Sequence, residues 1–428
     1  MIQSSWNIRT KNEIIWNDAW KRSFCAAGGK RADLHRIGRV VRVKKRIWGI
    51  LVLIGILACG TVLMTGCGSQ KEAGSSAAVA EEEPVYVPVH NPLTGVSEYD
   101  GFDKEAINQR IVSFVVENAP DARPQWGMTD EKYSPDIILQ GEVEGGISRT
   151  LWMYADYNKL PEVIGPMRSA RPPYIRFARL FDAIFFHWGK SHTEGGYIGA
   201  NTVFHEEMVS HIDEMTFDDD IGLYGRDSSR AVSSEHTGIL YGDKVPKAIK
   251  KKGFRETPNK FTNLRFYKKT KKVGKKALAL DVSFSERSFE NVYWNYDKED
   301  HMYHTSHFEN DLKRDNLLVL FDKTEYQEKT NYKGSGSSVV YCDYKLAGGK
   351  GQLLSQGKIK KIDWKVKNHK LILIDTKATK KAKEAAREAG KTEEEIEKIE
   401  VKAKMNQGKT WIGWVSSNHG GTSKVYND

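Results

Sequence analysis

Two arginines stand close together in the stretch VIGPMRSARPP (residues 163–173), where Arg168 and Arg171 flank Ser169 and precede a pair of prolines. The prolines suit the first turn of a helix, where a missing N–H has no consequence, and Ser169 stands where a helix N-cap is expected. Because a helix N-terminus already carries partial positive charge, the guanidinium groups require negative partners. Guanidinium forks match carboxylate and phosphate groups. The stretch therefore predicts either a site for an anionic ligand or an internal network of arginine–carboxylate pairs.

Further arginines occur in the motifs ARPQWG, EGGISR and GRDSSR, which begin at residues 122, 144 and 225. Glu144 and Asp227 stand in the same motifs and are available as partners. If an anion binds, the candidate residues are Arg123, Arg149, Arg168, Ser169, Arg171, Arg226 and Arg230. If the arginines pair internally, the same residues fix the loops instead.

A second group capable of chemistry lies in FFHWGKSHTEGGYIG (residues 185–199). His187 ends an apolar run, and Ser191, His192 and Glu194 follow it closely, as in an active-site loop. These four are the candidate catalytic residues of a hydrolase or transferase. However, no G-x-S-x-G elbow surrounds the serine, and neither this loop nor the later HEEMVSH has the spacing of a zinc site. The alternative is a glycine-shaped loop whose polar groups cap the backbone, and we expect no bound metal.

The overall charge and the remaining motifs exclude several classes of protein. Residues 1–66 hold 12 of the 66 Lys and Arg but only 3 of the 56 Asp and Glu, so nearly all of the net charge of +10 lies there. A nucleic-acid partner for the rest of the chain therefore lacks support. The sequence contains no P-loop, dinucleotide fingerprint or Cys-x-x-Cys pair, and we expect no cofactor.

The N-terminal part has the features of an export signal. A basic flank precedes an apolar run from Ile47 to Met64, and Thr65-Gly66-Cys67 follows. The small residues before Cys67 resemble the lipobox of bacterial lipoproteins, which implies cleavage after Gly66 and a diacylglyceryl, palmitate-bearing cysteine. The expected location is the extracytoplasmic face of the cell membrane. An uncleaved signal-anchor helix is the alternative, and Cys59 is a weaker lipobox candidate.

Shifts in composition divide the chain into segments. Asp243–Lys276 is strongly basic, which suggests either a solvated edge or contact with a polyanion such as lipid headgroups or a wall polymer. We expect an N-terminal extension and signal, a flexible tether, an α/β domain, a basic connecting segment, and a β-rich domain with a charged helical insertion at 377–407. Their bounds are 1–66, 67–90, 91–240, 241–276 and 277–428.

Hydrophobic patterning predicts a mixed α/β fold. Strands are expected over 110–118, 148–156 and 183–191, with a helix over 172–182 between the last two. This order is consistent with a crossover unit. Short β-branched and aromatic runs predict the C-terminal strands, at residues 316–322, 337–345, 358–366, 370–377 and 409–416.

The chain resembles the YerB-like family of bacterial lipoproteins, a domain family of unknown function, from about Asn91 to Ser416. The resemblance rests on the blocks NPLTG, ARPQWG, EGGISR, VIGPMRSAR, DAIFFHWGKS, GRDSSR and GKTWIGWV, in this order. The chain departs from the family at Val232–Thr237, which reads VSSEHT in place of a PHN-like stretch, and in its charged insertion. The resemblance implies an N-terminal layered α/β domain and a smaller β-rich C-terminal domain, with no known reaction.

Two classes of function follow. The first is a non-catalytic binding or scaffold lipoprotein of the cell envelope, with an arginine-lined anion site. The second is an envelope hydrolase or transferase that uses the His187, His192 and Glu194 loop. The expected partners are the membrane, through the lipidated cysteine, and an anionic wall polymer or lipid headgroups.

Overall fold

The computed structural model describes residues 89–428, apart from residues 131, 260 and 263. The predicted signal, the lipobox at Cys67 and most of the tether lie outside the described residues. Val87–Asp428 forms one compact unit. Within the described part of the chain, no helix is long and apolar enough to span a bilayer.

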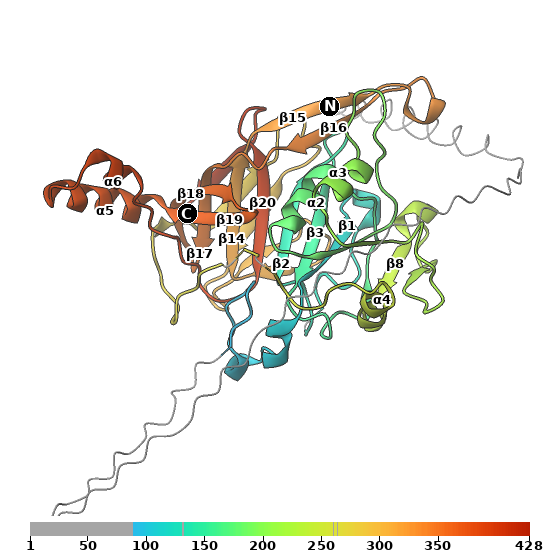
Figure 1. The fold of residues 1–428 in the computed structure, drawn as a ribbon, viewed down its shortest axis with the longest axis horizontal. Coiled ribbons are helices and arrows are strands. Elements are labelled where there is room, and N and C mark those ends of the chain that lie inside the picture. Colours follow the sequence, from blue (N-terminus) through green and yellow to red (C-terminus); the bar gives the residue numbers. More distant parts are fainter. Residues whose placement is uncertain (1–88, 131, 260, 263) are drawn as a thin grey trace, which may run out of the picture. The chain divides into compact units, whose positions relative to one another are not determined.

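An eleven-stranded sheet runs through the centre of this unit (Figure 1). Its strands, in spatial order, are β19 (Lys370–Asp375), β18 (Lys358–Lys367), β17 (Gly349–Ser355), β14 (Asn316–Asp322), β20 (Thr410–Ser416), β2 (Ile137–Glu142), β3 (Ser148–Tyr154), β1 (Val112–Glu117), β5 (Ile184–His187) and β6 (His211–Asp213), with β9 (Lys275–Lys276) beside β18.

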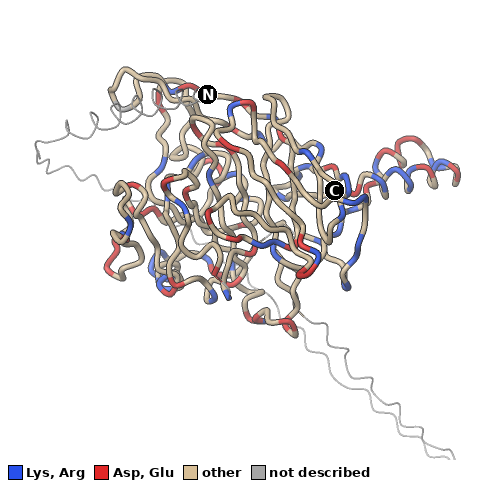
Figure 2. Tube along the Cα trace, turned by 180° about the vertical axis from the view of Figure 1, so that it is seen from behind, with Lys and Arg blue, Asp and Glu red and all other residues tan. Residues whose placement is uncertain are grey.

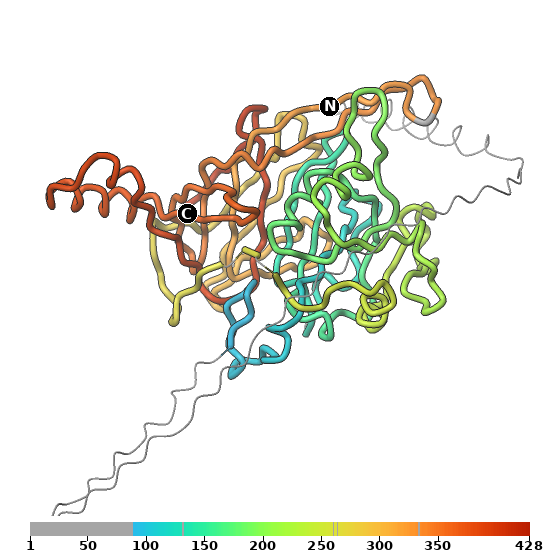
Figure 3. Tube along the Cα trace, in the orientation of Figure 1, coloured from blue at the N-terminus to red at the C-terminus, as the bar shows by residue number. Residues whose placement is uncertain are grey.

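The last long strand, β20, joins the two halves of the sequence. It lies between β14 and β2 and pairs in parallel with both. Every residue of β20 is buried, as its apolar sequence TWIGWV requires. The halves predicted as separate domains, 91–240 and 277–428, therefore share one continuous sheet, in which the red strand lies beside strands from the first half (Figure 3).

The directions of the strands correct the predicted crossover. β3 and β5 lie on opposite sides of β1, antiparallel and parallel to it respectively. The helix between them, α2 (Pro172–Arg179), thus connects antiparallel strands, because strand–helix–strand order alone does not fix direction. The parallel unit is instead β5, α3 (Ala200–Glu206) and β6.

The other strands of the described residues form three smaller sheets. A five-stranded sheet has the order β13 (Leu312–Arg314), β12 (Tyr303–Thr305), β11 (Val292–Tyr296), β10 (Ala279–Ser283) and β21 (Thr422–Tyr426). A three-stranded sheet has β4 (Val163–Ile164), β8 (Gly238–Tyr241) and β7 (Tyr224–Arg226), and a hairpin has β15 (Thr324–Lys329) and β16 (Val339–Tyr344).

Alternation along the central strands builds two apolar cores, one on each face of the large sheet. On β20, Ile412 and Trp414 belong to the core that includes α2, where Trp414 lies 5.4 Å from Phe177 between ring centroids. Trp411 belongs to the other core and packs at 5.4 Å on Trp294 of the five-stranded sheet. The large sheet is therefore covered on both faces.

The helix α2 begins at the two prolines as predicted, but Ser169 is not its N-cap. Arg171 occupies that position with extended backbone and no side-chain cap. The chain is still strand-like before it, since Ala170 forms a parallel bridge with Lys190. The two prolines need no acceptor for an N–H, so the helix begins without a capping side chain.

The charged insertion forms two helices, α5 (Thr376–Glu388) and α6 (Glu393–Glu397). Asp375 caps α5, and Thr392 with Glu395 forms a capping box on α6. Only Ala386 and Ile396 of these helices are buried. The pair projects beside β18 and β19 with both charges along it (Figures 1 and 2), in agreement with the predicted solvated excursion.

Another helix of the described residues, α4 (Val245–Lys251), lies far from α5 in Figure 1. Short 3-10 turns occupy several loops: Glu98–Asp100, Lys104–Asn108, Pro120–Ala122, Ser234–His236, Gly242–Lys244 and Tyr332–Gly334.

Candidate functional site

In the central sheet, each of the strands that run parallel to one another has a polar residue at its last position. Since the carboxyl ends of parallel strands meet at one edge, these side chains share that edge, which we call the carboxyl edge. Each of them is buried: Asp322 on β14, Ser416 on β20, Glu142 on β2, Glu117 on β1, His187 on β5 and Asp213 on β6. The antiparallel β3 begins at the same edge, where Arg149 pairs in register with Glu117. The predicted arginines and histidine gather here.

Glu144 is the centre of the first arginine group. Arg171 binds it with two donors, Nε to Oε2 at 3.0 Å and Nη2 to Oε1 at 2.5 Å, and Arg149 Nη2 lies 3.2 Å from Oε1. Burial alone would raise the pKa of Glu144, but Arg171 and Arg149 outweigh it and lower the pKa to about 2. Arg149 also donates to the carbonyl of Ser169 at 2.8 Å. Glu144, predicted from the sequence as a partner, is therefore saturated by arginine.

Arg168 belongs to a neighbouring group. Its Nε lies 3.0 Å from Glu117 Oε1, and its Nη2 lies 3.4 Å from Glu235 Oε2. His236 Nδ1 lies 2.9 Å from the other oxygen of Glu117. Burial opposes protonation of His236, but the bond to Glu117 raises its pKa overall. Glu235 and His236 come from VSSEHT, so the segment that departs from the family pattern supplies two members of this network.

The other candidate arginines bind protein groups as well. Arg123 forms a two-donor pair with Glu290, with Nη1 at 3.1 Å from Oε2, and also binds Asn118. Arg230 stacks 3.8 Å from the ring centroid of Trp126 and donates to the carbonyls of residues 122–124. Arg226 stacks 4.5 Å from the ring centroid of Trp188 and donates to the carbonyl of Ser234.

The two remaining polar groups of these motifs serve the backbone. Asp227 accepts from the N–H of Ser229 at 2.8 Å and has no ion pair with an arginine among the described residues. Ser169 Oγ donates to the carbonyl of Trp188 at 3.0 Å. Of the two alternatives drawn from the sequence, this geometry favours the internal network over a site of free guanidinium groups.

His187 lies wholly buried at the end of β5, where it contacts another histidine. Its Nδ1 lies 2.7 Å from the carbonyl oxygen of Gly189 and therefore carries the hydrogen, which leaves Nε2 to accept from His211 Nδ1 at 3.0 Å. Burial lowers the pKa of His187 to about 3 and that of His211 to about 4. Both rings are therefore neutral at pH 7, and His211 Nε2 is an acceptor.

The structure does not bring the predicted catalytic residues together. Ser191 is buried, and its Oγ accepts from Tyr197 OH at 2.8 Å and from the N–H of Ala200 at 3.0 Å, so it caps backbone at the start of α3. His192 is exposed. Glu194 is 65% exposed and pairs with Lys329 at 2.7 Å. Among the described residues, no hydrogen bond or ion pair joins any of these three to His187, which favours the glycine-shaped loop.

The neighbours that His187 does have were not identified from the sequence. Asp213 lies at the adjacent position on β6 and accepts from the N–H of Gly189 and from Lys190. His211 was visible in HEEMVSH, but that motif has no metal-site spacing. Only the parallel pairing of β5 with β6 places these residues beside His187. His211 and Asp213 also line a surface pocket of about 370 Å³, together with Ser210, Lys252 and Phe254.

Removing His211 should change how stability depends on pH. Its pKa is lowered from 6.5 to about 4 by folding, so its contribution is present above pH 6.5 and is lost as the pH falls towards 4. We expect the wild-type free energy of unfolding to fall more steeply than that of His211→Gln, by about 2 kcal/mol between pH 6.5 and 4. Urea denaturation at several pH values measures this, and parallel curves would show that His211 is not held neutral.

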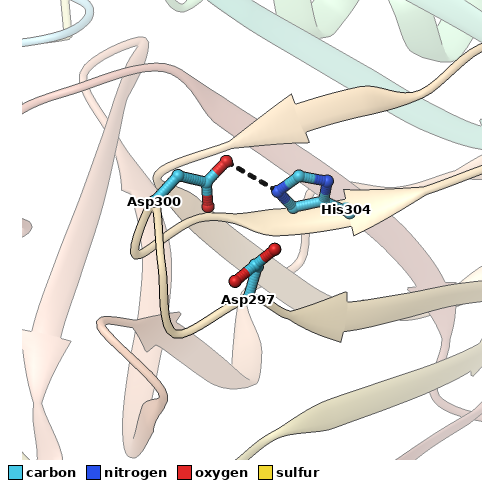
Figure 4. Close-up of side chains that lie close together, drawn as sticks. All are labelled: Asp297, Asp300 and His304. Atoms are coloured by element: carbon cyan, nitrogen blue, oxygen red, sulfur yellow. Dashed lines mark hydrogen bonds and ion pairs between the residues drawn. The ribbon is translucent and has the colours of Figure 1, made fainter.

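One cluster on the surface has the composition of a metal site. Asp297, Asp300 and His304 place their ligand atoms within 4.8 Å of one another near the β11–β12 turn (Figure 4). However, His304 already contacts Asp300 at 2.9 Å and Asp311 at 3.0 Å through its two ring nitrogens, and Lys313 lies 3.3 Å from Asp300. This arrangement is an exposed ion-pair network.

Comparisons with known proteins agree with the resemblance found in the sequence. Residues 93–255 match the family model described as "Protein of unknown function (DUF3048) N-terminal domain". The chain is 26% identical over 287 residues to YerB of Bacillus subtilis (strain 168), which is named as a lipoprotein, and the match covers 66% of this chain and 80% of that protein.

A crystal structure of YerB from Bacillus subtilis has the same fold. It superposes with a TM-score of 0.58 at 22% sequence identity, covering 78% of this chain and 99% of the YerB chain. The family description assigns no activity to the domain. The chain is therefore similar to YerB over most of the described residues, and its residues 93–255 match the model of the DUF3048 N-terminal domain.

Proposed function

We propose that this protein is a lipid-anchored, non-catalytic binding or scaffold protein on the extracytoplasmic face of the cell membrane. The lipobox-like Thr65-Gly66-Cys67 supports the anchor, as does the naming of its relative YerB as a lipoprotein. A diacylglyceryl group on Cys67 would hold the domain at the membrane. The folded part would then present its surface to envelope components.

The observation that carries the non-catalytic role is the closure of the arginine network. A site that stabilises an anion needs donors directed at open space. Here Arg171 binds both carboxylate oxygens of Glu144. Arg123 binds both carboxylate oxygens of Glu290. Arg168 lies between Glu117 and Glu235 and pairs with both. These pairs join loops that follow or precede β1, β2, β3 and β11, and they hold the carboxyl edge in one arrangement.

Thermal denaturation in the presence of anions tests this role. We expect phosphate, citrate and glycerol phosphate to raise the Tm of residues 87–428 no more than chloride at equal ionic strength, because the guanidinium groups are occupied. The predicted anion site would instead give a saturable rise of several degrees. Of the arginines that pair with glutamate at the carboxyl edge, Arg168 has the most exposed side chain, at 23%. Arg168→Ala should therefore abolish such a rise.

The control is Arg255→Ala. Arg255 also forms an ion pair, with Asp182 at 2.8 Å, but Asp182 precedes β5 and lies away from the carboxyl edge. A saturable shift that is lost in Arg168→Ala and kept in Arg255→Ala would contradict the scaffold role and establish an anion site.

A second candidate, an envelope hydrolase or transferase, has one observation in its favour. His211 presents an acceptor nitrogen beside the pocket that runs along β6, and the lining of this pocket reaches Asp213 at the carboxyl edge. Its pKa of about 4 makes it a weak base. Hydrolysis of a panel of ester, amide and phosphodiester substrates that is lost in His211→Gln and retained in the exposed His192→Gln would support this candidate.

A further inference from the structure

The structure divides the basic segment found in the sequence into two parts. The first part is α4 with its flanks, where Lys244 lies 2.7 Å from Asp243 and Lys251 contacts Asp218 and Asp220. Lys247 and Lys250 of α4 are exposed and form no ion pair among the described residues. The second part we call the basic strip. It consists of Arg265, Lys268, Lys269, Lys271, Lys272, Lys275 and Lys276, all of which are exposed.

The charges of the basic strip are uncompensated. The sequence contains no acidic residue between Glu256 and Asp281. Among the described residues, no side chain of the strip forms a hydrogen bond or an ion pair. The strip also continues onto β18, where Lys276 pairs in register with Lys358. In contrast to the arginines of the carboxyl edge, these cations are free to meet an external anion.

The backbone of the strip is fixed in place. Tyr267 donates its N–H to Met405 at 2.9 Å and Met405 donates to Arg265 at 2.8 Å. The side chain of Asn406 bonds both the N–H and the carbonyl of Lys271 at 2.8 Å. The lysines therefore project from an ordered surface, which lowers the entropy lost on binding.

The first described residues of the chain lie directly against this strip. A Cβ on Gly95 would come within 2.3 Å of the ring of Phe266, and Gly408 donates to the carbonyl of Thr94 at 2.8 Å. Figure 3 shows the blue start of the described chain beside the yellow segment, and Figure 2 shows Lys and Arg along that side. A flexible chain of about 20 residues, the length of the predicted tether, has a root-mean-square span of about 25 Å.

We propose that the basic strip lies against anionic lipid headgroups of the membrane to which the protein is anchored. The proposal rests on the lipid anchor of the proposed function. The position of the strip favours the bilayer over a wall polymer, because the strip adjoins the point where the chain arrives from Cys67. Each lysine near an anionic surface strengthens binding about fivefold, so the strip orients the domain with this end towards the lipid.

Vesicle flotation of the fragment 87–428 tests the strip without the anchor, because this compact unit contains both cores. We expect the fragment to float with vesicles that contain phosphatidylglycerol and not with pure phosphatidylcholine vesicles. Binding should vanish at about 1 M NaCl, where the Debye length is about 3 Å. The triple variant Lys268→Gln, Lys269→Gln, Lys272→Gln should lower the partition coefficient by roughly a hundredfold.

The matched control is Lys247→Gln, Lys250→Gln, Lys251→Gln, which removes the same charge from α4. Equal losses in the two triple variants would overturn the proposal, since net charge alone would then explain binding. Binding to soluble poly(glycerol phosphate) but not to phosphatidylglycerol vesicles would overturn it in favour of a wall polymer. Because the fragment lacks Cys67, these results do not depend on lipidation. If Cys67 is not lipidated, only experiments on the full chain will show it.

Discussion

Glu144→Gln is expected to lower the free energy of unfolding by about 3 kcal/mol. The substitution keeps the shape of the side chain but removes the charge that Arg149 and Arg171 share, and both arginines are buried. Breaking a buried pair by removing one partner leaves an uncompensated charge and costs about 3–5 kcal/mol. Urea denaturation of residues 87–428 at pH 7 measures the loss.

Glu194→Gln is the control for this prediction. Glu194 also pairs with a basic residue, Lys329, but it is 65% exposed, so we expect a loss below about 1 kcal/mol. The pKa of Glu144 is depressed to about 2, so its contribution is complete above pH 4.5 and declines as the pH falls towards 2. The difference between wild type and Glu144→Gln should therefore shrink in that window. Equal small losses for the two variants would contradict the network.

Cys67→Ala is expected to abolish lipidation completely. In the proposed anchor the diacylglyceryl group is attached to the sulfur of Cys67, and alanine provides no attachment atom. Cells supplied with labelled palmitate should label the wild-type protein and not the variant. The intact mass of the wild type should correspond to a chain that begins at Cys67 and carries lipid.

Cys59→Ala serves as the matched control for the anchor, since Cys59 is the weaker lipobox candidate in the same apolar run. It should keep the label. Loss of label in Cys59→Ala, with label retained in Cys67→Ala, would show that the lipid is attached to Cys59. An unlabelled wild-type protein that retains residues 1–66 would contradict the lipoprotein and support the signal-anchor alternative.

The local patterns of the sequence predicted most elements of the fold. The runs at 110–118, 148–156, 316–322 and 409–416 all contain strands, and the two prolines mark the start of α2. The sequence could not predict how distant strands pair. β20 inserts between β14 and β2 from far along the chain, and nothing local to TWIGWV specifies those neighbours. For the same reason the predicted crossover was wrong, because local sequence does not specify that β5 runs antiparallel to β3.

The candidate site was likewise predictable only where its residues lie close together in the sequence. The arginine motifs and one partner, Glu144, were evident because they lie in the same short blocks. Glu290 and Glu235 were not, because their pairs with Arg123 and Arg168 join residues far apart in the sequence. His211 and Asp213 reach His187 only through the pairing of β5 with β6. A sequence shows which groups need partners, while the sheet topology decides which partners they find.

The central claim is that the arginines of the carboxyl edge are structural, and the coupling free energy between Glu144 and Arg171 tests it most directly. Stability is measured for wild type, Glu144→Gln, Arg171→Met and the double variant. A buried pair predicts a coupling of about 2 kcal/mol, with the double variant less destabilised than the sum of the single variants. Additive effects, or an Arg171→Met variant more stable than wild type, would contradict the network and return Arg171 to the role of a ligand-binding residue.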